Sequence, residues 1–218
     1  MSFDPDIIGV VWLSLRVSIV AALIGLAIGA PTGAWMCMQA DKRRRIWLAF
    51  FSTLLAVPTV VVGLLVYMLL SRSGPLGALE LLFTPSAIIV AQAMITLPVV
   101  TVFAYRACAE PWNDYGEALR LDIRERWKQV LHLLRMARAG IIMAFLVAFG
   151  RAISEVGAVM IVGGNIKGAT RVMTTAITLE TRQGNFSFAV ALGLVLLAIS
   201  FAVTLTTWLI AQGRVDRV

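Results

Sequence analysis

The chain has 218 residues, of which 60% are hydrophobic and only 14% are charged, and its net charge is +7. Soluble domains carry about 45–50% apolar and about 25% charged residues, so this composition excludes an ordinary soluble globular domain. A positive charge of this size fits either a nucleic-acid-binding protein or a membrane protein, and the placement of the cations has to decide between them.

Long charge-free segments run along most of the chain, at residues 17–40, 46–71, 81–105 and 183–213. Each has at least 24 residues, whereas a helix needs about 20 to cross a hydrocarbon core roughly 30 Å thick. Two shorter charge-free runs, 139–150 and 156–166, flank Arg151 and Glu155 and together predict one more helix of membrane length. The sequence therefore predicts an all-α membrane protein, one domain over residues 1–218, with five spans near 12–38, 47–70, 86–108, 140–162 and 187–211.

The first span is expected to be retained rather than cleaved. No basic stretch precedes its apolar residues and Arg16 interrupts them, which is a poor match to a signal peptide. Cys37 and Cys108 come near the ends of two spans, and we expect two reduced packing cysteines rather than a disulfide.

Lys and Arg are distributed unevenly between the two sets of loops. The loop 39–46, the segment 105–139 and the C-terminal tail hold thirteen of them, and the opposite loops hold four. Cytoplasmic flanks retain positive charge far more often than translocated ones. The count predicts an N-terminus outside and a C-terminus in the cytoplasm. The net positive charge is then explained by the cations of the cytoplasmic loops, with no need for a nucleic-acid partner.

Three predicted spans contain proline, at Pro31, Pro58 and Pro98. Such breaks are tolerated in membranes when neighbouring helices or a watery cavity satisfy the freed backbone groups. The prolines indicate either kinked packing helices or the lining of a path.

The largest polar region, about 109–139, has the pattern of a basic amphipathic helix on the cytoplasmic side. Apolar residues at spacings of three and four predict one apolar stripe: Leu119, Ile123, Trp127, Val130, Leu131 and Leu134. Basic residues line another face: Arg120, Arg124, Lys128, His132 and Arg135. Such a helix either lies among lipid headgroups or docks into a cytoplasmic partner. Between Arg120 and Arg138, Trp127 is the only aromatic residue, so no nucleic-acid partner is expected.

Part of this segment resembles the EAA loop of type I ABC-importer permeases. The similarity is carried by Tyr-Gly-Glu-Ala-Leu-Arg at 115–120, by Trp127 and by Ala-Arg-Ala-Gly at 137–140. In place of the family's second alanine and its glycine, this sequence has Leu119 and Ile123. The resemblance implies a coupling helix that docks into an ATPase subunit through Glu117, Ala118, Leu119, Arg120, Asp122, Ile123 and Arg124.

Other stretches resemble permeases for tetrahedral oxyanions, so that the similarity covers almost the whole chain. They include residues 56–64, 71–77 and, most specifically, GRAISEVGAVMIVGGN at 150–165. This last run and the continuation at 170–181 are similar to tungstate permeases, with molybdate and sulfate permeases related to them. The resemblance implies a homodimer served by two ATPase subunits and an extracytoplasmic oxyanion-binding protein.

Arg151 and Glu155 are separated by four residues, which places them on one face of a helix. A charge in the middle of a span costs about 2.5–3.5 kcal/mol on insertion scales. The pair either braces helix packing or borders a translocation path on which Arg151 attracts a dianion and Glu155 prevents its trapping. Hydrogen-bonding groups that we place along the same route are Thr59, Ser154 and Asn165.

The sequence contains no machinery for catalysis. It lacks the G-x-x-x-x-G-K-[ST] phosphate loop, has a single histidine, His132, and has no Cys/His cluster for a metal. Bringing a dianion into an inside-negative cell costs roughly 4.6 kcal/mol per 100 mV. We therefore expect a non-catalytic membrane subunit that binds no cofactor itself, while a separate ATPase uses ATP and Mg²⁺.

Three alternatives stay open at this stage. The substrate of such a permease is tungstate by resemblance, but molybdate or sulfate is possible on physical grounds. An ATP-independent anion carrier or channel would use Arg151 and Glu155 as a selectivity or relay pair. A scaffold protein would use the basic helix only to recruit a partner and would move no solute.

Overall fold

The structure is a computed structural model that describes residues 5–215, with side chains for residues 7–210. Within that part of the chain every regular element is helical, which confirms the predicted all-α class. The tail cations Arg214 and Arg217 lie outside the described side chains. The elements are α1 (Pro5–Cys37), α2 (Asp41–Leu55), α3 (Thr59–Leu70), the short 3₁₀ turn η1 (Gly77–Leu79), α4 (Pro85–Asp122), α5 (Arg126–Met136), α6 (Arg138–Ile153), α7 (Gly157–Gly163), α8 (Met173–Arg182) and α9 (Phe186–Val215).

Three helices are long and apolar enough to cross a membrane, namely α1, α4 and α9. α4 and α9 contain the spans predicted at 86–108 and 187–211, and α1 covers the span predicted at 12–38 except for its last residue. Counting two sharply bent helix pairs as one span each raises the number to five. α4 does not stop where its apolar stretch stops, because the helix continues to Asp122 and carries the first part of the predicted cytoplasmic segment.

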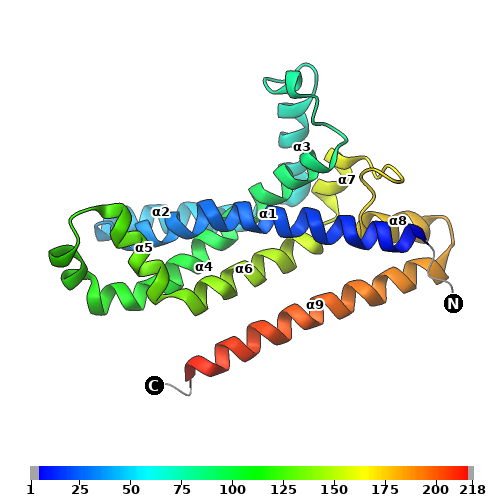
Figure 1. The fold of residues 1–218 in the computed structure, drawn as a ribbon. Coiled ribbons are helices and arrows are strands. Elements are labelled where there is room, and N and C mark those ends of the chain that lie inside the picture. The colour runs from blue at the N-terminus through cyan, green and yellow to red at the C-terminus, as the bar shows by residue number, and fades with distance from the viewer. Residues whose placement is uncertain (1–4, 216–218) are drawn as a thin grey trace.

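The prediction of one continuous helix over 47–70 is wrong. α2 and α3 are separate helices that meet at an angle of 93°, and α3 points away from the long helices in Figure 1. Pro58 stands at the N-cap of α3. Proline has no N–H to donate and disfavours a helical conformation in the residue before it, so α2 ends ahead of it and the chain starts again in a new direction.

The single helix predicted over 140–162 is also interrupted. α6 ends at Ile153 and α7 begins at Gly157, which leaves Glu155 in the break. An oxygen of the Glu155 carboxylate accepts a hydrogen bond from the backbone N–H of Ala158, at 3.2 Å. A side-chain acceptor for a first-turn N–H stabilises the start of a helix, so Glu155 supports the first turn of α7 from the break before it.

α1 and α4 form the centre of the bundle, and three glycines let them approach closely. Gly25, Gly29 and Gly33 follow each other at intervals of four on one face of α1. A Cβ on Gly33 would lie 2.5 Å from the carbonyl oxygen of Thr101 on α4, and one on Gly25 would lie 2.6 Å from a side-chain oxygen on the same helix. Small residues at this spacing bring membrane helices into backbone contact.

Buried clusters join the remaining helices to this central pair. The largest connects α1, α4, α6, α8 and α9, and a second connects α3 and α7 to α1 and α4. A third, at the end formed by α5, contains Cys37 and Cys108, which are buried and, among the described residues, are not joined by a disulfide. α9 packs on α6 and α8 and leaves an exposed apolar stripe for lipid along its length: Phe186, Val190, Leu194, Leu197, Phe201, Leu205 and Trp208.

Candidate functional site

Arg151 and Glu155 form an ion pair across the end of α6 and the break that follows. The guanidinium Nη1 lies 3.7 Å from the carboxylate Oε2. The two partners differ in exposure, since the Arg151 side chain is 45% exposed and that of Glu155 only 3%. The predicted proximity holds although the helix does not continue, and the pair offers an accessible cation backed by a buried anion.

Glu155 is fixed by both its side chain and its backbone. Besides receiving the N–H of Ala158 on its carboxylate, it accepts on its backbone oxygen a hydrogen bond from the hydroxyl of Thr174, at 2.8 Å. The N–H of Ala158 and the guanidinium of Arg151 reduce the cost of burying the carboxylate, because a buried charge needs both a counter-charge and hydrogen bonds, and the Thr174 hydroxyl satisfies the backbone carbonyl.

Arg151 lines a cavity of about 290 Å³ at the bend between α2 and α3. Thr59, the first residue of α3, lies in the same wall. The Cβ position of Gly157 lies 3.7 Å from the Thr59 hydroxyl and 3.7 Å from the Glu155 carboxylate, so Gly157 is adjacent to both groups. The rest of the wall is apolar and comes from α2, α3, α4 and the residues between α2 and α3: Leu54, Leu55, Val57, Val62, Leu65, Met94, Ile95, Pro98 and Val99.

The other two residues predicted along the route are placed differently. Ser154 is exposed in the break, but its hydroxyl donates to the carbonyls of Gly150 and Arg151 in its own helix. Asn165 follows α7, has a left-handed backbone with φ of 53°, and is separated from Glu155 by that helix, about 10 Å in length. The structure therefore brings together Arg151, Glu155 and Thr59.

The predicted coupling residues lie at the end of α4 and in the turn that follows. Glu117, Ala118, Arg120, Asp122 and Arg124 are exposed there. Leu119 instead packs inward, in the cluster that contains Cys37 and Cys108. Ile123 ends α4 in an extended conformation, with φ of −124° and ψ of 111°. This conformation is open to any residue, so the turn does not require the glycine of the family pattern.

In the second half of the predicted apolar stripe, Val130 and Leu134 pack against the cluster that contains Cys37 and Cys108, whereas Trp127 and Leu131 are exposed. Because the helix stops at Asp122 and restarts at Arg126, the phase of the pattern changes between α4 and α5. Trp127 is 65% exposed, while Leu133 is fully buried in its place. Gln129 is also buried and donates to the carbonyl of Ile123 at 2.6 Å, which holds the turn.

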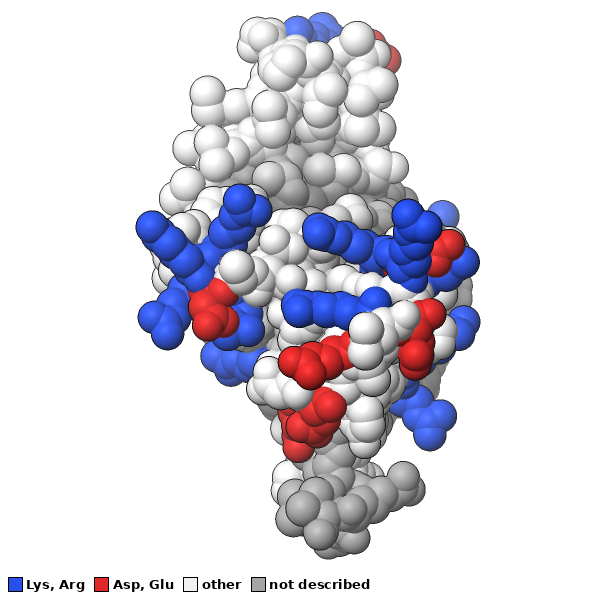
Figure 2. Space-filling view, turned by 90° about the vertical axis from the view of Figure 1, so that its left-hand side faces the viewer, with Lys and Arg blue, Asp and Glu red and all other residues white. Residues whose placement is uncertain are grey.

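The same end of the molecule carries most of the cations, as Figure 2 shows. A hollow of about 240 Å³ opens there between the start of α2 and the end of α4, lined by Arg44, Trp112, Asn113, Asp114, Gly116, Glu117 and Arg120. The Arg120 guanidinium lies 5.0 Å from the centre of the Trp112 ring, a cation–π contact. Leu121, beside this hollow in the sequence, is 88% exposed. Leu121 was not predicted from the sequence because it falls outside the predicted apolar stripe. Its position as an apolar residue among charged ones could have indicated a contact surface.

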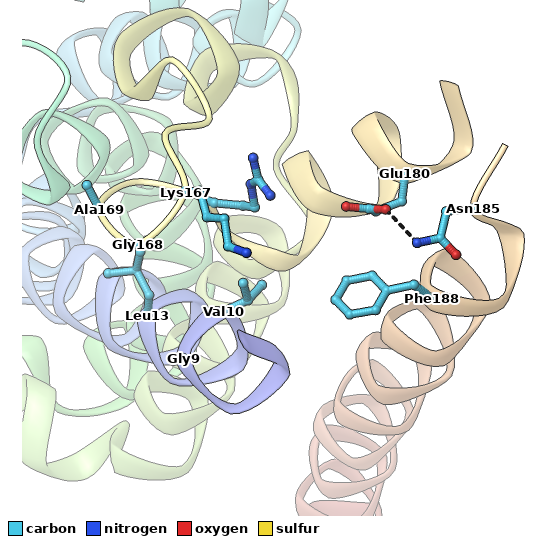
Figure 3. A pocket seen from close by; sticks show the side chains of 10 residues that line it. Gly9, Val10, Leu13, Lys167, Gly168, Ala169, Glu180, Asn185 and Phe188 are labelled. Carbon is cyan, nitrogen blue, oxygen red and sulfur yellow. Dashed lines mark hydrogen bonds between the residues drawn. The ribbon is translucent and has the colours of Figure 1, made fainter. Parts of the chain in front are cut away.

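A further cavity, of about 380 Å³, lies at the opposite end of the bundle (Figure 3). It is bordered by the first turns of α1, the loop before α8, and the α8–α9 junction. Arg171 lines it, Lys167 lies on one side of it, and Glu180, which accepts a 2.9 Å hydrogen bond from Asn185, lies on the other (Figure 3). These cations belong to the smaller set that predicts the outer side.

Comparison with known proteins identifies the class. Residues 23–214 match the family model described as "binding-protein-dependent transport system inner membrane component", and the chain belongs to this family. With its apolar helices, the chain is a multi-pass protein of the plasma membrane and a non-catalytic permease subunit of an ABC importer of the oxyanion type. Importers of this family work with an ATPase and a binding protein.

Individual relatives cover nearly the whole chain. The tungstate uptake system permease protein TupB of Peptoclostridium acidaminophilum is 39% identical over 93% of this chain and 89% of its own. A probable anion ABC transporter permease protein of Haloferax volcanii is 41% identical over 90% and 87%. TupB of Campylobacter jejuni is 39% identical over 76% and 70%. More distant matches, at 28% and 25% identity, are named as molybdenum and sulfate transport permeases.

Proposed function

We propose that this chain is the permease of a tungstate importer, in which two copies form the path for the anion. The observation that carries this proposal is the half-exposed guanidinium of Arg151, which lines a cavity at a break in an apolar helix. The choice of tungstate over molybdate or sulfate rests on the 39% identity to permeases named for tungstate uptake.

A second copy is needed because the cavity lies at the edge of one chain. α3 projects away from the direction of the long helices and has 12 residues, a length of about 18 Å, too short to span a bilayer alone. Its exposed side chains are almost all large and apolar: Val60, Val61, Leu64, Leu65, Tyr67, Met68 and Leu69. We propose that α3 packs against its equivalent region in a homodimer, so that Arg151 and Thr59 of both copies face an enclosed route.

Within that route Arg151 attracts the dianion and Glu155 limits how tightly it is held. A path conducts only if binding is strong enough for entry and weak enough for release. A buried carboxylate 3.7 Å from the guanidinium weakens the local positive potential, and Thr59 supplies a hydroxyl in the same wall. We assign Ser154 and Asn165 smaller roles along the route, because the Ser154 hydroxyl bonds its own helix and Asn165 lies beyond α7.

At the cytoplasmic end, two ATPase subunits dock on the exposed residues of the α4–α5 turn. Glu117, Ala118, Arg120, Asp122, Ile123 and Arg124 make up this surface, with Leu119 as its packed inner side. ATP and Mg²⁺ are used there by the ATPase, and the permease itself binds no cofactor. The positive charge of this end is typical of a cytoplasmic face, so the C-terminus lies inside.

An extracytoplasmic binding protein delivers the anion to the end that holds Lys167, Arg171 and Glu180. Closure of the ATPases on ATP then moves the coupling turns, and the bundle changes from inward-facing to outward-facing. The energy of ATP is required because a dianion enters against the membrane potential at a cost of roughly 4.6 kcal/mol per 100 mV.

The test is the ATPase activity of the complex that co-purifies with the tagged chain from native membranes. Mg-ATP hydrolysis is measured with the binding protein empty, then loaded with tungstate, molybdate or sulfate. We expect stimulation by the loaded protein, greatest with tungstate. A greater effect of molybdate or sulfate would reassign the substrate, and a well-folded preparation without ATPase would overturn the proposal.

A further inference from the structure

We infer that Gln92 and Thr174 are positioning residues for the charged pair, and that Thr174 connects the outer helix α8 to it. The inference rests on the proposed function in one respect, namely that Arg151 and Glu155 border the path. Neither residue is part of the predicted site, and they come from α4 and α8.

The break between α6 and α7 leaves backbone carbonyls that a continuous helix would satisfy. The carbonyl of Ala152 accepts the backbone N–H of Glu155 at 3.1 Å, and the side-chain amide of Gln92 donates to the same oxygen from α4, at 2.9 Å. The Gln92 side chain is 2% exposed, and its own oxygen is buried without a donor. The bond that Gln92 makes is to the last turn of α6. It therefore fixes the position of the turn from which the Arg151 side chain extends.

Thr174 holds the other side of the break. Its hydroxyl donates to the backbone oxygen of Glu155 at 2.8 Å, and both residues are buried. The start of α8 is itself anchored, since the N–H of Met173 donates to the hydroxyl of Ser14 on α1, also at 2.8 Å. The position of the Glu155 backbone is therefore tied to a helix that belongs to the outer part of the molecule.

The segment between α7 and α8 is likewise held by hydrogen bonds between a side chain and the backbone. The hydroxyl of Thr170 donates to the carbonyl of Gly163 and accepts the N–H of Ile166. A displacement of this outer segment by a docking partner is consequently passed to α8 and through Thr174 to Glu155. With Gln92 holding the α6 side from α4, relative movement of α4 and α8 has to change the separation within the charged pair.

The chain offers matched controls for both residues. Thr178 lies one turn further along α8, and its hydroxyl donates only within its own helix, to the carbonyl of Thr174. Thr101 is buried on α4 and likewise bonds its own helix, at Leu97. We compare Thr174→Val with Thr178→Val, and Gln92→Leu with Thr101→Val, and use Thr174→Ser as the variant that keeps the hydroxyl.

The first measurement reads the geometry of the break without transport. Ser154 is exposed, whereas Cys37 and Cys108 are buried, so a Ser154→Cys variant of the full complex gives a labelling site for a water-soluble thiol reagent. We expect Thr174→Val and Gln92→Leu to change the labelling rate by about threefold or more, with Thr178→Val, Thr101→Val and Thr174→Ser close to the parent. An unchanged rate in both test variants would overturn the inference.

The second measurement is a double-mutant cycle on ATP-driven tungstate uptake by the assembled complex. Loss of one neutral hydrogen bond predicts a decrease of about three- to tenfold for Thr174→Val alone. If Thr174 acts through Glu155, the same change in a Glu155→Gln background lowers uptake by less than about twofold more. Independent, multiplying effects would overturn the inference. Unchanged uptake in Glu155→Gln itself would show that the charged pair does not border the path, and the inference would then be judged by the labelling rates alone. If Glu155→Gln does not assemble, Arg151→Lys is used in its place.

Discussion

Gly63 on α3 and Ala158 on α7 are in backbone contact: a Cβ on Gly63 would lie 2.6 Å from the Cα of Ala158. Because the obstructing atom belongs to the backbone, no side-chain rotation can relieve the clash. This contact holds α3 against α7, the short helix that follows Glu155.

Gly63→Ala is expected to destabilise the protein by about 1–3 kcal/mol, the usual cost of overpacking. Thermal unfolding of the purified protein in detergent measures it. Gly193→Ala on α9 is the matched control, because nothing lies within 4 Å of its Cβ position. Equal melting temperatures for the two variants would show that α3 and α7 are not in close contact.

Arg151→Ala is expected to lower tungstate uptake by about tenfold to hundredfold. A contact to a charged group is worth about 1.5–3 kcal/mol, and each 1.4 kcal/mol corresponds to a factor of ten in rate. Uptake is measured at equal amounts of assembled complex, with Arg138→Ala, an exposed cation at the start of the same helix, as control. Normal uptake together with lowered stability would support a purely structural ion pair.

Glu117→Lys is expected to abolish stimulation of ATP hydrolysis by the loaded binding protein, and uptake with it. The carboxylate is exposed on the docking surface beside Arg120, and reversing its sign opposes contacts made by a partner that fits the present charges. Glu117→Gln keeps the shape and should retain part of the stimulation. Fully coupled uptake in Glu117→Lys would count strongly against this surface.

Leu119 and Leu121 provide a paired test of inner and outer sides. Leu119→Ala removes a buried side chain and should cost about 2–5 kcal/mol of stability. Leu121→Ala changes a side chain that is almost fully exposed, so the stability of the permease should stay the same while co-purification of the ATPase decreases. If both variants lose stability alike, the orientation of this end of α4 is wrong.

The sequence predicted the long helices well and the breaks poorly. Charge-free runs are sufficient to predict α1, α4 and α9. A segment that is covered by lipid has to satisfy its backbone hydrogen bonds internally, and a helix does so. Proline does not locate the breaks, since Pro31 and Pro98 lie inside continuous helices while Pro58 accompanies a 93° turn. What decides is whether neighbouring groups satisfy the freed backbone, and those groups are distant in sequence.

The same reason limits prediction of the site. The i, i+4 spacing of Arg151 and Glu155 was enough to predict their proximity, and Thr59 joined them through the fold. Gln92 and Thr174 could not be found this way, since their partners Ala152 and Glu155 lie 60 and 19 residues away along the chain. Trp127 was misplaced because its helix restarts in a new phase after residues 123–125.

The most direct test of the central claim is tungstate accumulation in proteoliposomes that contain the permease with its ATPase, and the binding protein on the side of Lys167 and Arg171. We predict accumulation above equilibrium only when Mg-ATP is present on the ATPase side, and none without the binding protein. Tungstate that equilibrates at the same rate without ATP would contradict the account and establish a carrier or channel instead.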